Sequence, residues 1–120
     1  MGRIDKINQR IKREIGDIVL KELKDPRLEF VSITHVEVSR DLQHAKVYFS
    51  VLGRGNQVQK AGEGLLSARG FVRKLIGQRV RMRYTPEIEF IFDHSIEYSA
   101  RIEAALEEIQ HETEKDYQDN

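Results

Sequence analysis

Residues 68–77 read ARGFVRKLIG and decide how this chain folds. Apolar residues recur here at steps of three and four, as they do over residues 58–68, and this spacing predicts helix. A glycine inside a helix costs roughly 1 kcal/mol relative to alanine. Gly70 therefore favours a kink, at Ala68-Arg69-Gly70, between two helices. Asn56 is the expected N-cap of the first helix, and Gly77 is the expected end of the second.

Strand patterns lie on both sides of this helical stretch. Residues 30–39 are β-branched and roughly alternating, with a phase slip near Thr34-His35 that indicates a bulge or burial on both faces. A polar turn joins them to a second strand at 45–52, so that the two strands make a hairpin. The last strand is expected over residues 87–93.

An apolar stripe from Ile4 to Leu23 predicts a long first helix with a basic outer face. The helix should end at Asp25-Pro26, because the residue before a proline is pushed out of the helical region. The expected order is therefore helix, strand, strand, helix, kink, helix, strand, helix. The economical packing for that order is an α+β fold, in which a three-stranded sheet has its helices packed on one face.

The C-terminal end of the chain has a different composition. A short apolar stripe over residues 102–109 predicts a last helix, which Asp93 or Ser95 can cap. The residues that follow are polar and acidic. We therefore expect one domain over residues 1–110 and a frayed or disordered tail over residues 111–120.

Length and composition narrow the class of protein. The chain has 120 residues, which fits one domain, and it has no cysteine. The lack of cysteine excludes disulfides and thiolate metal sites and fits a reducing compartment, the cytoplasm. No apolar run approaches about 18 residues, so we expect no membrane span and no signal peptide. The histidines have no ligand motif around them, so we expect no metal and no cofactor.

The formal net charge of zero hides a strong asymmetry along the chain. Residues 54–83 carry eight basic residues and one acidic residue, whereas residues 84–120 carry two basic and eleven acidic residues. Within the basic part, residues 69–83 contain no acidic residue. A solvated helix face usually mixes the two signs, so this row of cations favours contact with phosphates over an ordinary solvated face.

Two groups of basic residues make up the candidate nucleic-acid-binding surface. One group lies on the outer face of the first helix, and the other lies in and after the kink, where free backbone N–H groups can also hold an anion. The candidates are Arg3, Lys6, Arg10, Arg13, Arg69, Gly70, Arg73, Lys74, Arg79, Arg81 and Arg83. The aromatic residues of the strands are expected in the core, so recognition should rest mainly on the nucleic-acid backbone and its shape.

The sequence gives little indication of a catalytic site. Glu87, Glu89 and Asp93 share one face of the last strand and could form an acid–base pair, but a half-solvated strand explains them as well. The sequence has no nucleophile elbow and no phosphate-binding glycine loop. We expect no enzyme. Two hypotheses remain beside nucleic-acid binding: a small acid–base enzyme, and a protein-interaction module whose acidic C-terminal end recruits a basic partner.

Four stretches, taken in order, resemble one family. They are Asp25-Pro26 after the first helix, DLQHAKVYFS at 41–50, Ala68-Arg69-Gly70, and RYTPEIEFIFD at 83–93. By their order and spacing the chain resembles bacterial ribosome-binding factor A, from about Ile4 to Ile109.

The resemblance implies a KH-like domain of the type II order, in which an Ala-x-Gly kink replaces the usual Gly-x-x-Gly loop. It implies a ribosome assembly factor that binds the immature small (30S) subunit and its 16S rRNA. This factor would assist late maturation and 16S rRNA processing and act in cold adaptation. An assembly GTPase is a further candidate partner, and we expect the factor itself to be a monomer.

Overall fold

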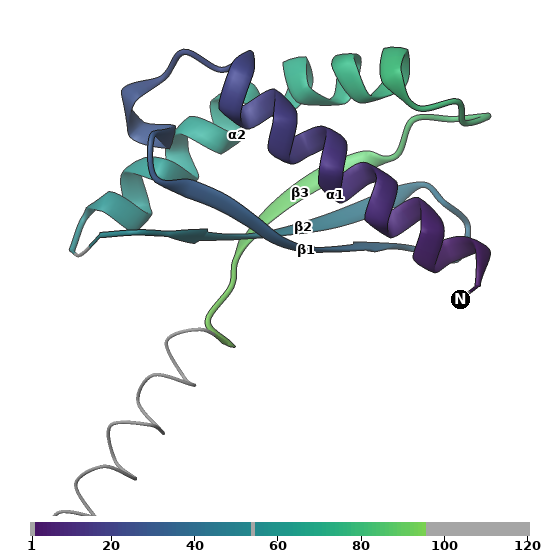
Figure 1. The fold of residues 1–120 in the computed structure, drawn as a ribbon, viewed down its shortest axis with the longest axis horizontal. Coiled ribbons are helices and arrows are strands. Elements are labelled where there is room, and N and C mark those ends of the chain that lie inside the picture. The colour runs from purple at the N-terminus through teal and green to yellow at the C-terminus, as the bar shows by residue number, and fades with distance from the viewer. Residues whose placement is uncertain (1, 54, 96–120) are drawn as a thin grey trace, which may run out of the picture.

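The computed structural model describes residues 2–53 and 55–95 of the chain. The elements are α1 (Arg3–Lys21), the 3-10 helix η1 (Pro26–Leu28), β1 (Val31–Val38), β2 (His44–Val51), α2 (Gln57–Arg79) and β3 (Glu87–Phe92). Both α-helices lie on the same side of one sheet (Figure 1). This arrangement confirms the expected α+β fold. The helix expected over residues 102–109 and the tail over 111–120 lie outside the described residues.

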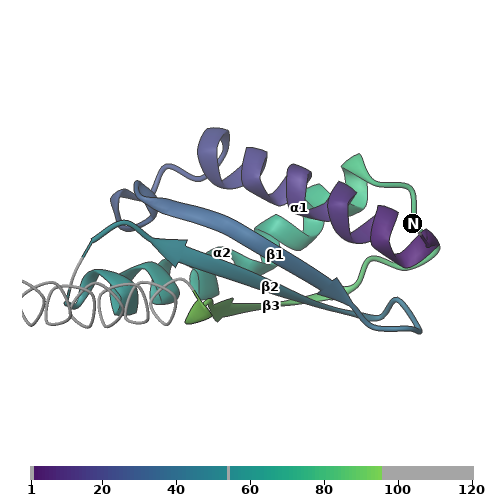
Figure 2. The same ribbon diagram turned by 60° about the horizontal axis from the view of Figure 1, so that its bottom comes forward.

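The three strands follow the order β1-β2-β3 in the sheet (Figure 2). β1 and β2 are antiparallel, as a hairpin requires, whereas β3 runs parallel to β2 and so needs the crossover that α2 supplies. The register of β1 against β2 shifts between Ile33 and His35, which confirms the expected bulge. Both β1 and β3 are edge strands of the described sheet.

The core fills the space between the sheet and the two helices. The stripe of α1 and one face of α2 meet there, and alternate residues of the strands point toward them. Fully buried side chains include Ile11, Ile15, Ile18, Val47, Leu65, Val72 and Ile76. Each contributes about 1.5–3 kcal/mol relative to an exposed position, so this contact holds the helices in place.

α1 ends one turn earlier than expected. Its last residue is Lys21, and Glu22 is its C-cap. Asp25 instead caps η1, because its carboxylate accepts a hydrogen bond from the backbone N–H of Arg27 at 2.9 Å. Pro26 thus begins a new turn, a position that suits proline, and the prediction that Asp25-Pro26 closes the first helix is wrong.

The two helices expected on either side of Gly70 form one continuous α-helix, α2, so the prediction of two separate helices is wrong. The ribbon of α2 changes direction along its length (Figure 1). Asn56 occupies the N-cap position, as expected, but its side chain makes no capping hydrogen bond. Gly77 is not the end of the helix either, since α2 continues to Arg79.

Candidate nucleic-acid interface

A basic groove lies between the N-terminal half of α1, the β1–β2 turn and the segment that follows α2. Its volume is about 550 Å³. The basic residues that line it are Arg3, Lys6, Arg10, Arg81 and Arg83. Candidates from opposite ends of the described chain therefore meet in one site, because the core packs the start of α1 beside the end of α2.

Asp41 is the one acidic residue among those lining the basic groove. It belongs to the β1–β2 turn, where its carboxylate accepts hydrogen bonds from the hydroxyl of Ser39 at 2.6 Å and the backbone N–H of Gln43 at 3.1 Å. These two donors lower the pKa of Asp41, the Ser39 hydroxyl most strongly. The ionised carboxylate of Asp41 therefore stabilises the β1–β2 turn. In the same turn, Leu42 takes a left-handed φ of 61°.

A second basic hollow continues the groove along α2. Its lining residues are Gly70, Arg73, Lys74, Gly77, Arg83, Tyr84 and Thr85. Arg83 and Tyr84 line both hollows, so the two form one surface, which we call the basic surface. A guanidinium N–H of Arg73 donates to the carbonyl oxygen of Thr85 at 3.0 Å and ties the segment after α2 to the helix.

Two glycines of α2 line this hollow in different ways. A Cβ at Gly77 would lie 2.7 Å from Thr85 Oγ1, so any larger residue would force the Thr85 side chain to shift. A Cβ at Gly70 would meet no atom within 4 Å. Gly70 therefore leaves the helix backbone open to solvent, and nothing in the described chain explains its cost of roughly 1 kcal/mol to the helix.

Tyr84 is a candidate that the sequence-based prediction missed. Its surface is 64% exposed, and the guanidinium carbon of Arg83 lies 5.6 Å from the centre of its ring. An exposed aromatic ring beside cations is a stacking platform for nucleic-acid bases. The signal available in the sequence was its position directly after Arg83 and three residues after Arg81, in a segment that is not a strand.

Arg79 does not contribute to the basic surface, and this corrects its place among the candidates. One of its guanidinium nitrogens lies 2.8 Å from Asp17 and 3.3 Å from Glu14, and another lies 3.4 Å from Glu22. Asp17 does most to raise the pKa of Arg79. The charge of Arg79 is thus neutralised by three carboxylates of the first helix and its C-cap, where it joins α1 to α2.

The remaining candidate arginines differ in whether they line a hollow and in whether their guanidinium groups already have partners. Arg10 lines the basic groove, although its guanidinium also contacts Glu14 at 3.2 Å and donates to the carbonyl oxygen of Arg79 at 3.2 Å. Arg13 and Arg69 are exposed but line neither hollow. Arg69 lies one turn before Arg73 and extends the row of cations along α2.

The carboxylates proposed for an enzyme are not arranged for catalysis. Glu87 and Glu89 are exposed on the face of β3 that points away from the helices. Asp93 accepts hydrogen bonds from Ser95 and from the hydroxyl of Thr34, and these lower its pKa. A carboxylate held ionised in this way is a poor proton donor or acceptor near neutral pH.

Two further features of the described chain bear on the class of site. Within residues 2–53 and 55–95, no cluster of three or more His, Asp or Glu side chains is placed to hold a metal ion. In the same residues, neither α-helix combines the length and hydrophobicity needed to cross a membrane. The acidic end on which the protein-interaction hypothesis depends lies outside the described residues.

The fold and the basic surface define a small α+β binding domain, whose element order agrees with the type II KH-like order except that α2 is one helix. The family model of Ribosome-binding factor A matches residues 3–106. The chain belongs to the ribosome-binding factor A family. A relative, ribosome-binding factor A of Halothermothrix orenii, is 49% identical over 114 residues, which cover 95% of this chain and 93% of the relative.

Solved structures show the same similarity. The crystal structure of ribosome-binding factor A from Thermus thermophilus is 26% identical, with a TM-score of 0.67, and the match covers 76% of this chain and 96% of that one. A homology model of the Thermus thermophilus factor, fitted into the cryo-EM map of its complex with 30S, is 26% identical, with a TM-score of 0.61, and the match covers 72% and 91% of the two chains. The described fold is therefore shared with solved members of the family.

Proposed function

We propose that this chain is a non-enzymatic assembly factor that binds the small (30S) ribosomal subunit through 16S rRNA, and that its basic surface makes the contact. Membership of the family and the 30S complex of the Thermus thermophilus relative support this choice of partner. The observation that carries the proposal is the meeting of the two basic hollows at Arg83 and Tyr84.

The basic surface offers three kinds of contact to RNA. Its arginines can bind phosphate oxygens through two parallel hydrogen bonds, and its lysines act as point charges. The ring of Tyr84 can stack on an unpaired base. Gly70 lets a sugar-phosphate backbone approach the open side of α2, where any larger residue would place a side chain.

The proposed role is to hold an immature conformation of the rRNA late in maturation, including 16S rRNA processing, and to contribute to cold adaptation. We place it in the cytoplasm, as a monomer whose domain spans residues 1–110. The neutral net charge supports such a role, because few phosphate contacts give a modest affinity that lets a factor leave the mature subunit. An assembly GTPase is a candidate for the trigger of release.

Two lysines provide a matched test. Lys74 lies in the basic surface, whereas Lys46 is exposed on β2, and both substitutions, K74E and K46E, change the net charge equally. We expect K74E to lose co-sedimentation with 30S precursors and K46E to keep it. An equal loss in both variants would mean that binding depends on overall charge alone, and full retention by K74E would place the site elsewhere.

Crosslinking identifies the partner directly. Ultraviolet crosslinking of the full chain to 30S precursors, followed by mass spectrometry, should recover 16S rRNA nucleotides attached to the peptide that contains Tyr84. Crosslinks that reach only ribosomal proteins would contradict the proposal, whatever the effect of K74E.

A further inference from the structure

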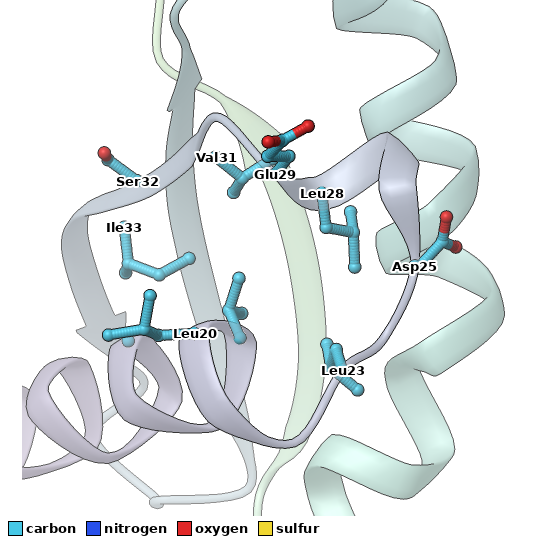
Figure 3. Close-up of a pocket in the computed structure, with 10 residues that line it drawn as sticks. Leu20, Leu23, Asp25, Leu28, Glu29, Val31, Ser32 and Ile33 are labelled. Atoms are coloured by element: carbon cyan, nitrogen blue, oxygen red, sulfur yellow. The ribbon is translucent and has the colours of Figure 1, made fainter.

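An apolar groove lies between the C-terminal half of α1 and the start of β1, at the opposite end of α1 from the basic groove. Its volume is about 460 Å³, a size typical of binding pockets. Its apolar lining comes from the end of α1 and the residues after it, from η1 and from β1, and includes Leu20, Leu23, Leu28, Val31 and Ile33 (Figure 3). Leu20 is 80% exposed, so one wall of the groove is uncovered within the described residues.

The backbone of β1 is open beside the same groove. Leu52 donates its backbone N–H to the carbonyl oxygen of Phe30 at 3.1 Å, so these two residues form a hydrogen-bonded pair of the antiparallel ladder. Because such pairs alternate with non-hydrogen-bonded ones, Val31 and Ile33 direct their N–H and C=O groups away from β2. Within residues 2–53 and 55–95, these outward groups have no hydrogen-bond partner.

The other end of β1 is closed to a partner. The backbone N–H of Val38 also points away from β2, but it donates to the side-chain oxygen of Asn8 in α1 at 2.9 Å. The bulge between Ile33 and His35 separates this closed end from the open one, because a bulge bends the strand and disrupts regular pairing. The free edge that a partner strand could use is therefore short and lies beside the apolar groove.

The charged residues that line the apolar groove are both acidic. Asp25 is already paired, since the guanidinium of Arg27 lies 2.7 Å from its carboxylate. Glu29 is exposed and forms no ion pair within the described residues. Lys60 borders a neighbouring hollow together with Glu29 but does not line the apolar groove. The unpaired charge of the groove is thus negative, which favours a basic occupant over a nucleic acid.

We propose that the apolar groove and the open edge of β1 bind an extended, basic peptide segment of a small-subunit protein by strand addition. The inference rests on the proposed function, because it takes the 30S subunit as the source of the peptide. The segment would pair with the outward backbone groups of Val31 and Ile33 and extend the sheet beyond β1. In strand addition, main-chain hydrogen bonds give affinity, and pockets for alternate side chains give specificity.

The geometry specifies the pattern of the bound segment. Alternate residues of a strand point to opposite faces of the sheet, so every second side chain of the segment would enter the groove beside Leu20 and Leu23 and should be apolar. A lysine or arginine of the segment would lie near Glu29. Arg10, in the basic groove, and Leu20 are ten positions apart in α1, about 15 Å along the helix, so RNA and the peptide can bind at the same time.

A defined peptide tests the site without the ribosome. The probe is acetyl-KVKLKVK-amide, added to the full chain. We expect hydrogen exchange of the backbone N–H groups of Val31 and Ile33 to slow by about tenfold or more at saturation. Exchange at Val38 should not change, because its N–H is already bonded to Asn8. Unchanged exchange at Val31 and Ile33 would overturn the proposal, and so would equal binding of the same peptide with its backbone nitrogens methylated.

Two glutamates provide a matched test of the charge argument. E29K should weaken binding of the peptide probe by about fivefold, the effect of one exposed ion pair. E87K makes the same change of charge at an exposed residue of β3 and should leave the affinity unchanged. Equal losses in the two variants would mean that the peptide responds to net charge and does not occupy the apolar groove.

Crosslinking in the 30S complex identifies the source of the peptide. A benzophenone amino acid in place of Leu20 should crosslink the full chain, bound to purified 30S precursors, to a basic segment of one ribosomal protein. The same group in place of Leu66, which is 62% exposed on α2, should not reach that segment. Crosslinks from position 20 only to rRNA would overturn the proposal, and crosslinks only to a second copy of this chain would assign the groove to self-association.

The outcome at Tyr84 separates this inference from the proposed function. If the peptide that contains Tyr84 is crosslinked to 16S rRNA and position 20 reaches no ribosomal protein, the strand-addition proposal is wrong and the proposed function stands. If the chain does not bind 30S precursors at all, the proposed function fails, and the 30S subunit is not the source of a peptide for the groove.

Discussion

At the scale of single residues, position in the fold gives the same residue type opposite roles. Gly70 and Gly77 both lie inside α2, yet a Cβ at Gly70 would meet open space, and one at Gly77 would lie 2.7 Å from Thr85 Oγ1. The arginines divide in the same way, since Arg83 lines the basic surface and Arg79 is surrounded by carboxylates.

The two glycines should respond to alanine with opposite signs. We expect G70A to raise the free energy of unfolding by up to about 1 kcal/mol, because alanine is the better helix former and meets no clash. G77A should lower it, because the new methyl group displaces Thr85. Urea unfolding of both variants measures the difference. A G70A variant that is less stable than the wild type would show that Gly70 has a structural role after all.

Tyr84 should matter for RNA and not for stability, because it is largely exposed. We expect Y84A to weaken binding to 16S rRNA by about 1–3 kcal/mol, the usual contribution of one stacked base. Y84F should keep most of the affinity, because it retains the ring. Filter binding and a thermal melt of each variant give the two quantities. Equal losses in Y84A and Y84F would assign the effect to the hydroxyl group and not to stacking.

At the scale of elements, Arg79 joins α2 to α1 through Glu14, Asp17 and Glu22. Removing its charge would leave three carboxylates facing one another on the first helix and its C-cap. We therefore expect R79A to lower the melting temperature more than R69A, a matched change at an exposed arginine of the same helix. The double variant D17N/R79A should recover part of the loss, and no recovery would mean that the carboxylates do not repel one another.

The same contact predicts a pH dependence. Lys21 first, and then Arg79, hold the pKa of Asp17 below its ordinary value of 3.8. A lowered pKa stabilises the folded state above that ordinary value, and this stability is lost as the pH falls through the folded pKa. Wild-type protein should therefore lose more stability than R79A between neutral pH and pH values below about 4. Melting temperatures across that range give the comparison, and parallel curves would contradict it.

At the scale of the whole molecule, a basic surface near one end of α1 is combined with a net charge of zero. If three to five phosphates are bound, the logarithm of the affinity should fall against the logarithm of salt with a slope of roughly −0.9 per contact. R83E should reduce that slope by about one contact. Titrations of 16S rRNA fragments at several salt concentrations measure both slopes. A flat response in the wild type would show that the basic surface does not bind phosphates.

The parts of the fold that depend on local patterns were predictable. The hairpin, the bulge near Thr34 and the buried stripe of α1 each follow from the spacing of apolar residues over a few positions. The prediction of two separate helices around Gly70 failed because packing of Leu65, Val72 and Ile76 keeps α2 helical through a residue of low helix propensity. The predicted end of α1 was wrong because Pro26 begins a new turn instead of closing the helix.

The sequence by itself determined the α+β class, the family and the set of basic residues that have no acidic neighbours along the chain. Periodicity, composition and motif order are properties of the chain alone. Only the tertiary structure decided which cations can act together. It joined Arg3 and Lys6 with Arg81 and Arg83, added Tyr84, and neutralised Arg79 against Asp17, a residue 62 positions away. The physical reason is that charges interact through space, so their pairing depends on how the core packs the helices.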